Sequence, residues 1–327
     1  MRRKRVVAIA IFIALVIVQM MSIPSAPSSW RTAATGQSWA SEIYQEGGNQ
    51  QLALLEVKGE IIESSDNSSI FATTGGYNHQ VFLEQLEYAF SDNAFKGVVL
   101  YVDSPGGGVF ESDQIYQEIV RLKNEFNKPL VVYMGKMAAS GGYYISAPAD
   151  KILANRNTIT GSIGVVMGNL NFKELLERYG VKDQTFVSGE NKTIMSQYHE
   201  MTEEQAQIIQ SIIDESYQYF VDVIVEGRGL EREKVLEIAD GRVYTALQAK
   251  QAGLIDELGS LEDAFDQAAS LAGVVDPTIV SFQANTWNFS NFLYKLPNML
   301  GRSWNLSSSL DELPSLHQPS IMYIWKW

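Results

Sequence analysis

The sequence predicts an α/β fold built on a parallel β-sheet. Short apolar runs typical of strands alternate along the chain with longer segments in which apolar residues recur at helical spacing. Glycine-rich stretches follow several of these runs, as expected where a buried strand turns into a helix. Between two compositionally distinct ends, roughly 230 residues remain, which is enough for one large domain or two small ones.

The predicted strands are short runs dominated by Val, Ile, Leu and other apolar residues. They lie at 52–57, 97–102, 130–133, 151–154, 163–167, 184–187 and 278–283. Glycine, proline or polar residues bound most of them, so each strand ends within a few residues. Strands separated by helices require crossover connections, which favours parallel pairing.

The predicted helices have apolar residues three or four positions apart. They cover 81–90, 109–126, 172–179, 202–227, 232–239, 245–252 and 261–272, and a short one follows the glycine-rich turn at 140–147. The helix at 202–227 has a clear start signal, because Thr202 is a good N-cap and two glutamates follow it. Residues 64–77 are polar and glycine-rich and are expected to form a loop.

The start of the chain predicts a membrane anchor. Residues 2–5 are all basic, and 6–23 form an 18-residue segment without charge. That length is short but sufficient to span a bilayer, and the basic cluster would stay on the cytoplasmic side. We therefore expect a cytoplasmic segment at 1–5, an anchor at 6–23 and an extracytoplasmic remainder. A cleaved signal peptide is the alternative interpretation.

Composition sets the other boundaries. Residues 24–50 are rich in Ser, Gly, Gln, Ala and Thr and have little periodicity, so they are expected to form a linker. A compact domain is expected at 51–283. The last 44 residues, 284–327, hold four of the six tryptophans and little charge, and are expected to form a separate tail.

Composition also excludes several classes of function. The chain has no cysteine, which removes thiol nucleophiles, cysteine-based zinc sites and iron–sulfur clusters. Its net charge is −13, even though four of its 25 basic residues lie at positions 2–5. The acidic remainder repels phosphate groups, so no nucleic-acid binding is expected.

Two glycine-rich loops, each directly after an apolar strand, form the candidate site. They are 103–108 (DSPGGG) and 137–142 (MAASGG). Successive glycines leave backbone N–H groups free to face a ligand, and in acyl transfer such groups make an oxyanion hole. The second loop places Ser140 at a helix start. A serine there is also a common N-cap, so its position alone does not identify a nucleophile.

A nucleophilic serine needs a base within hydrogen-bond reach. The chain has three histidines, His79, His199 and His317, and each is expected to be a solvated surface residue. A lysine is the other possible base, provided that an apolar site holds it neutral. Lys192 has apolar neighbours at 194 and 195, but the residues alone favour a surface position for it.

Four stretches together resemble the signal peptide peptidase A family. They are VVLYVDSPGGGVFES, MGKMAASGGYYIS, ITGSIGVVMG and SGENKTIMS, and they occur in the family's order. The resemblance implies a crotonase-like or Clp-like fold of repeated ββα units. It implies that Ser140 is the nucleophile and Lys192 the general base, with Ser162 orienting the lysine. Gly107 and Gly141 would donate the N–H groups of the oxyanion hole.

The resemblance also implies a function. It points to a membrane-anchored serine endopeptidase with a Ser/Lys dyad that cleaves apolar peptides, such as residual signal peptides, without metal or cofactor. The short, single-repeat members form ring-shaped homo-oligomers in which Ser and Lys of one site come from neighbouring subunits, and this chain has one copy of each motif. The tail could enter the enzyme's own groove as an extended peptide, rest at the membrane interface or pack as a strand.

Three other functions stay open at this point. A crotonase-type acyl-CoA enzyme would share the fold and the oxyanion glycines, although the predicted export segment argues against it. A Clp-type Ser–His–Asp protease needs a histidine after Ser140, which leaves His199 and His317. A non-catalytic membrane scaffold would tolerate the loss of Ser140.

Overall fold

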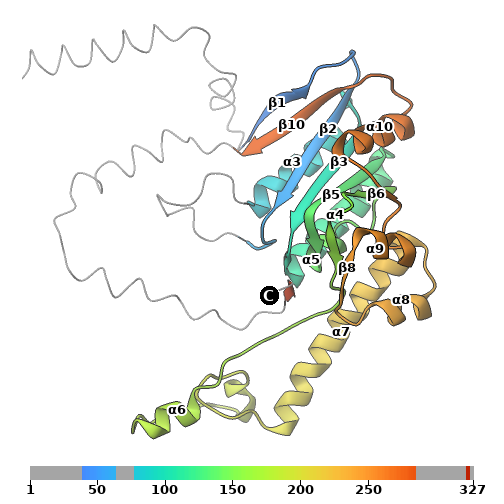
Figure 1. Cartoon of the computed structure of the whole chain (residues 1–327). Coiled ribbons are helices and arrows are strands. Elements are labelled where there is room, and N and C mark those ends of the chain that lie inside the picture. The colour runs from blue at the N-terminus through green and yellow to red at the C-terminus, as the bar shows by residue number, and fades with distance from the viewer. Residues whose placement is uncertain (1–38, 64–76, 285–321, 325–327) are drawn as a thin grey trace, which may run out of the picture. The chain divides into compact units, whose positions relative to one another are not determined.

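The computed structural model of the chain describes residues 39–63, 77–284 and 322–324 (Figure 1). Contacts divide the chain into two units, and only 39–40 and 283–284 of the first are described, so the account concerns the second, 41–282 with 322–324. The expected cytoplasmic segment, the anchor at 6–23 and most of the tail lie outside the described residues. Within the described part, no helix is long and apolar enough to cross a membrane.

A largely parallel sheet of nine strands forms the centre of the unit. Its order is β1-β10-β2-β3-β5-β6-β9, with β7 beside β5 and β8 beside β7. The strands are β1 (Trp39–Gln45), β2 (Gln51–Lys58), β3 (Phe95–Ser104), β5 (Leu130–Ala139), β6 (Lys151–Ala154), β7 (Ile159–Gly161), β8 (Val243–Thr245), β9 (Glu257–Leu258) and β10 (Thr278–Ala284). Strands β10, β2, β3, β5, β6 and β9 pair in parallel in that order. The predicted α/β class is confirmed.

Helices connect most of these strands. They are α3 (His79–Ser91), α4 (Val109–Phe126), α5 (Gly141–Tyr144), α6 (Lys173–Arg178), α7 (Glu203–Arg228), α8 (Arg232–Ile238), α9 (Ala246–Ala252) and α10 (Leu261–Ala272), with a 3-10 helix, η1, at Glu190–Thr193. Apart from the short α5, each predicted helix is found within two residues of its expected ends. Thr202 caps α7 as predicted, since its hydroxyl accepts the N–H of Gln205 at 3.2 Å.

Both faces of the sheet are buried, which explains why its central strands are continuous apolar runs. On one face, Leu52, Leu54 and Val99 form a cluster with residues of α10, including Phe265. Alternate residues point to the other face. There α5 covers β3, because a Cβ added to Gly142 would lie 3.6 Å from the side chain of Val102. The sheet is therefore a rigid layer that fixes the loops at its edges.

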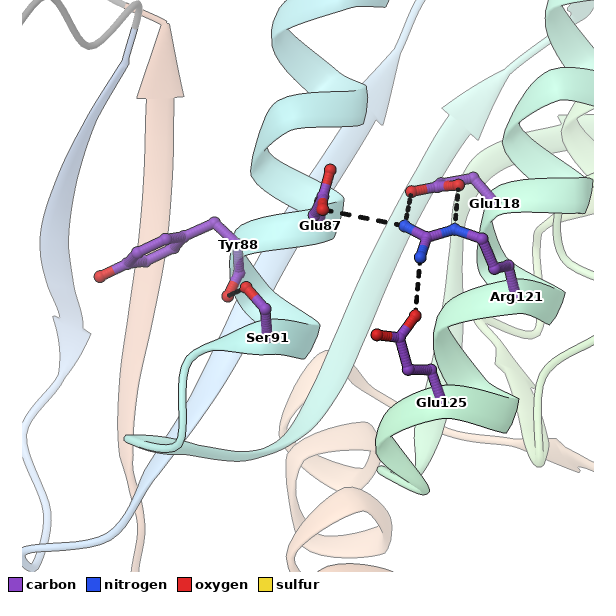
Figure 2. Close-up of polar contacts among 6 residues, drawn as sticks. All are labelled: Glu87, Tyr88, Ser91, Glu118, Arg121 and Glu125. Carbon is purple, nitrogen blue, oxygen red and sulfur yellow. Dashed lines mark hydrogen bonds and ion pairs between the residues drawn. The ribbon is translucent and has the colours of Figure 1, made fainter.

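An exposed ion cluster joins α3 to α4 (Figure 2). The Arg121 guanidinium lies 2.6 Å from Glu118 and 2.7 Å from Glu125 on its own helix, and 3.9 Å from Glu87 on α3. Because Arg121 is nearly half exposed, solvent screens these pairs and their net contribution is at most about 1 kcal/mol. The cluster aligns two helices but forms no site of its own.

The structure corrects three sequence-based expectations. Residues 39–45, which fall in the expected linker, form β1, whose mostly exposed side chains give no alternating pattern. The predicted strand at 163–167 is absent, and the strand in this region instead lies earlier, at β7, between β5 and β8. The predicted strand at 184–187 is also absent, and Phe186 there is 96% exposed. This apolar run does not form a strand, because it is exposed and no strand of the described residues lies beside it to pair with.

Candidate active site

Ser140 lies in a strained turn between β5 and α5. Its φ of 53° and ψ of −117° lie in a region that residues other than glycine rarely adopt. The turn is held by hydrogen bonds at both ends, since its N–H donates to Gly161 O at 2.7 Å and its carbonyl accepts from Tyr144 N at 2.9 Å. Ser140 makes no side-chain capping bond to α5. Its place at the helix start therefore does not reflect a capping role.

The first glycine-rich loop runs alongside this turn as a short strand, β4 (Gly106–Gly108). Ile61 holds it from one side, donating to Gly106 O at 2.9 Å and accepting from Gly108 N at 2.8 Å. A Cβ on Gly107 would lie only 1.9 Å from the Ile61 carbonyl oxygen, so glycine is required there. The two predicted loops meet, because Gly107 N lies 3.1 Å from the position that a Cβ on Gly141 would take.

A third segment, β11 (Met322–Ile324), lies along the glycine loop. It pairs antiparallel with β4, with Tyr323 opposite Gly107. On its other side, Met322 exchanges two hydrogen bonds of 3.1 Å with the backbone of Val166. A Cβ on Gly106 would lie 2.0 Å from Tyr323 O and 2.7 Å from Gly141 N, so this carbonyl oxygen and this amide share one small region. We call the place between β4 and Val166 the strand site.

The side chain of Tyr323 is completely buried beside the strand site. Its ring stacks on Tyr144 at a centroid distance of 4.9 Å and lies 4.8 Å from the ring of Phe220. Its hydroxyl donates to Ser216 O at 2.8 Å. Burial, followed by the nearby Asp113 carboxylate, raises the pKa of Tyr323, so the phenol stays neutral. The rings of Tyr144 and Phe220, which surround Tyr323, suit a large aromatic or apolar side chain.

Ser162 lies next to the nucleophile turn. It follows β7, which pairs with the end of β5 so that Gly161 is opposite Ala139. Ser162 has a φ of 51° and its N–H donates to Arg242 O at 2.8 Å. It is 7% exposed. The structure thus brings together four of the five predicted site residues: Ser140, Gly141, Gly107 and Ser162.

The fifth residue, Lys192, lies elsewhere. It belongs to η1 and is exposed, and its N–H donates to Gly189 O at 3.0 Å. Among the described residues, its side chain makes no hydrogen bond or ion pair. Gln205 ties η1 to the start of α7 by donating from Nε2 to Glu190 O at 3.0 Å. Lys192 is therefore well anchored but not joined to Ser140 within this chain.

The described histidines do not supply an alternative base. The prediction that His79 is solvated is wrong, because it is 6% exposed, and its ring nitrogens contact Tyr77 Oη at 2.5 Å and Gln114 Oε1 at 2.9 Å. The Nε2 of His199 lies 2.8 Å from Asp183. Neither contacts Ser140 within the described part of the chain, and His317 lies outside it.

Sequence reasoning anticipated one part of the site only as an alternative and missed another. It left the placement of the tail open among three alternatives, and for residues 322–324 the pairing of β11 with β4 bears out packing as a strand. It also overlooked Ser112 in α4, whose hydroxyl lies 2.5 Å from the position of a Cβ on Gly141. The apolar spacing of the helix gave no signal for this contact, because a contact between a helix residue and a loop leaves no periodic pattern in the sequence.

The comparisons with known proteins agree with this geometry. Residues 123–275 match the model of peptidase family S49, and residues 66–162 match that of Clp protease. A protein of Enterococcus faecium that carries the name signal peptide peptidase SppA is 41% identical over 251 residues, which cover 76% of this chain and 72% of the relative. Protease 4 of Haemophilus influenzae is 35% identical over 72% of this chain and 37% of its own length. Serine protease SPPA, chloroplastic, of Arabidopsis thaliana is 29% identical over 82% of this chain.

Proposed function

The chain belongs to the SppA family of serine peptidases, peptidase family S49, and from that premise we propose that it cleaves extended apolar peptides with Ser140 as nucleophile and Lys192 as general base. The observation that carries the proposal is the pairing of β11 with the glycine loop. A peptide that adds a strand to β4 gains main-chain hydrogen bonds whatever its sequence, while one pocket-filling side chain supplies preference. Segment 322–324 has this arrangement beside Ser140.

The reaction would proceed in two steps. Neutral Lys192 takes the proton of the Ser140 hydroxyl, and Oγ forms a bond to the scissile carbonyl carbon. The N–H groups of Gly107 and Gly141 receive the negative oxygen, and each such donor contributes about 3–4 kcal/mol at the transition state. The lysine then protonates the leaving amine. Water, deprotonated by the same lysine, releases the acyl group and restores the serine.

A second copy of the chain would supply the lysine. The arm at 167–201, which carries Lys192, exposes large apolar side chains, among them Leu170 at 65%, Tyr179 at 76% and Phe186 at 96%. An apolar surface of this kind is typical of a contact between subunits. In a ring-shaped homo-oligomer the arm of one copy would cover the next, which would bring Lys192 to Ser140 and Ser162 and exclude water from the base.

Apolar substrates fit the aromatic residues that surround Tyr323. Tyr144 and Phe220, whose rings contact that of Tyr323, can accept a flat or branched side chain. With the expected anchor at 6–23, the domain would act outside the cytoplasm beside the bilayer, where residual signal peptides remain after export. Both the aromatic surroundings of Tyr323 and the expected place of the enzyme support this class of peptide.

The test is hydrolysis of a fluorogenic apolar peptide by the full chain in detergent, with Ser140→Ala and Lys192→Ala alongside. We expect both variants to lose activity while they keep the fold and oligomeric state of the wild type. Lys182→Ala, another exposed arm lysine, is the matched control and should keep its rate. Activity in Ser140→Ala would remove the proposed nucleophile and favour a scaffold role with a contaminating peptidase.

A further inference from the structure

We propose that Ser112 is a positioning residue that holds the Gly141 N–H in place for catalysis. The proposal rests on the function proposed above, in which Gly141 follows the nucleophile and donates to the oxyanion. Ser112 lies in the first turns of α4, directly after the glycine loop. It is completely buried and no catalytic step uses it.

The hydroxyl of Ser112 has no hydrogen-bond partner among the described residues, although its Oγ is inaccessible to solvent. A buried polar atom without a partner destabilises the fold, because the group gave up its hydrogen bonds to water and gained none. Such an atom therefore calls for a reason other than stability.

Other serines of the chain show what this hydroxyl could have done. In helices, serine commonly donates to the carbonyl four residues earlier. Ser146, in the turn after α5, makes this bond to Gly142 O at 2.6 Å, and Ser216 in α7 makes it to Ile212 O at 3.0 Å. The same bond would join Ser112 to Gly108 O, yet it is not formed. The hydroxyl of Ser112 is turned away from its own helix.

It is turned toward the nucleophile turn instead. A Cβ built on Gly141 would lie 2.5 Å from Ser112 Oγ and 3.1 Å from Gly107 N. The hydroxyl oxygen thus occupies the space beside the Gly141 Cα, on the side of the glycine loop. This contact explains both why residue 141 has no side chain and why residue 112 is small.

The contact matters because the turn has little support of its own. Helix α5 has only four residues, and Ser140 is held in an unfavourable backbone conformation. Helix α4 has 18 residues and packs beside α5, so Ser112 joins the turn to a rigid element. Without the oxygen, Gly141 could move toward the glycine loop. A shift of the amide would weaken its bond to the oxyanion but leave the binding of substrate unchanged.

The experiment compares Ser112→Ala with the wild type and Ser146→Ala, all as full chains in detergent. We expect kcat of Ser112→Ala to fall on the order of tenfold to a hundredfold, with KM within about twofold. Affinity for a peptide boronic acid, which forms a tetrahedral adduct with serine, should fall by a similar factor, and affinity for the corresponding peptide amide should not.

Thermal unfolding supplies the second readout. Ser112→Ala removes an unpartnered hydroxyl, so its midpoint should stay within about 1 °C of the wild type or rise, whereas Ser146→Ala loses a made hydrogen bond and should fall by about 2–4 °C with kcat unchanged. A normal kcat and boronic acid affinity in Ser112→Ala would overturn the proposal. So would a loss of stability or fold larger than that of Ser146→Ala, because the hydroxyl would then be structural.

Ser140→Ala, run in the same series, separates this inference from the proposed function. If Ser140→Ala still cleaves the peptide, the assignment of the nucleophile fails and the positioning role with it. If Ser140→Ala is inactive while Ser112→Ala behaves as wild type, only the positioning role fails.

Discussion

Single residues set the spacing of the two amides in the proposed oxyanion hole. Neither Gly107 nor Gly141 has room for a side chain, because a Cβ would lie 1.9 Å from Ile61 O at Gly107 and 2.5 Å from Ser112 Oγ at Gly141. Neither has a positive φ, so their role is close approach and not backbone freedom. This distinguishes them from glycines that end helices, such as Gly229, whose φ is 60°.

Replacing Gly107 by alanine tests this spacing. The added Cβ would lie 1.9 Å from Ile61 O, so the loop must move away from Ile61, which displaces the Gly107 N–H. We expect kcat to fall by about 10²–10³, the loss typical of one oxyanion donor. Gly168→Ala is the matched control, since nothing lies within 4 Å of its Cβ position and its φ is not positive. Wild-type kcat in Gly107→Ala would exclude this amide from the oxyanion hole.

Asp256 makes the free energy of unfolding depend on pH under acidic conditions. Burial alone would raise the pKa of Asp256, but the Ile152 N–H at 2.8 Å and the Arg228 guanidinium at 2.7 Å outweigh it and lower the pKa. Because the folded pKa lies below the unfolded value of about 3.9, this stabilisation is complete above that value and is lost as pH falls through the folded pKa.

The Asp256→Asn variant isolates this effect. We expect it to lose on the order of 1–3 kcal/mol at neutral pH, because the mostly buried Arg228 loses its counter-charge. Below about pH 4 the difference from wild type should shrink. Denaturant unfolding between about pH 2 and 7 measures both curves, and a difference that does not change with pH would contradict the account.

At the level of elements, helix α7 connects the segment that carries Lys192, the proposed base, with the strand site of the same chain. Its first turn holds η1, which carries Lys192, through the bond from Gln205 to Glu190 O. Its middle contributes Phe220 and Ser216 to the surroundings of Tyr323. A 26-residue helix is a stiff connection between these two places.

Gln205→Glu tests the first of these connections. The glutamate keeps the acceptor that Thr202 N uses at 3.1 Å, but its carboxylate cannot donate to Glu190 O. We expect kcat to fall about tenfold as η1 loosens, with α7 intact by circular dichroism. Thr202→Ala, which removes the cap hydroxyl but keeps Gln205, should cost about 1 kcal/mol of stability and little kcat. Equal kcat in the two variants would argue against a role for Gln205 in placing the base.

The pairing of β11 with β4 predicts competition between this segment and external peptides. Tyr323→Ala removes the buried ring, so the strand site should open and KM for a short apolar peptide should fall on the order of tenfold. Tyr323→Phe keeps both ring contacts and loses only the bond to Ser216 O, so its KM should lie between those of the wild type and Tyr323→Ala. If KM is the same in all three proteins, segment 322–324 does not occupy the substrate's place.

Element by element, the sequence predicts what depends on local signals. Helix α4 begins and ends at the predicted residues, and α10 does too, because the apolar spacing and the glycines beside them, Gly108 before α4 and Gly273 after α10, are local signals. The meeting of both glycine-rich loops was also predictable, since parallel strands end at one edge of a sheet. The pairing of β4 with β11 was not, because three glycines carry no strand signal and their partner is distant in sequence.

At the level of the whole molecule, the proposed contacts between copies of the chain explain why the strand prediction at 184–187 was wrong. The run at 184–187 has the composition of a strand but lies exposed in the chain. Its apolar character, like that of Tyr179 and Leu170, fits burial by a neighbouring copy, which no pattern within one chain can show. The resemblance of the motifs assigned Lys192 a catalytic role, while the structure of one chain leaves it exposed and apart from Ser140.

The central claim is that a complete site joins Ser140 of one copy to Lys192 of the next, and mixing of subunits tests it most directly. Ser140→Ala and Lys192→Ala, each inactive alone, are dissociated, mixed in equal amounts and reassembled. A random mixture should recover about a quarter of wild-type activity, because one in four contacts pairs an intact serine with an intact lysine. If the mixture stays inactive while its oligomers form normally, Ser140 and Lys192 do not act across copies and the account is contradicted.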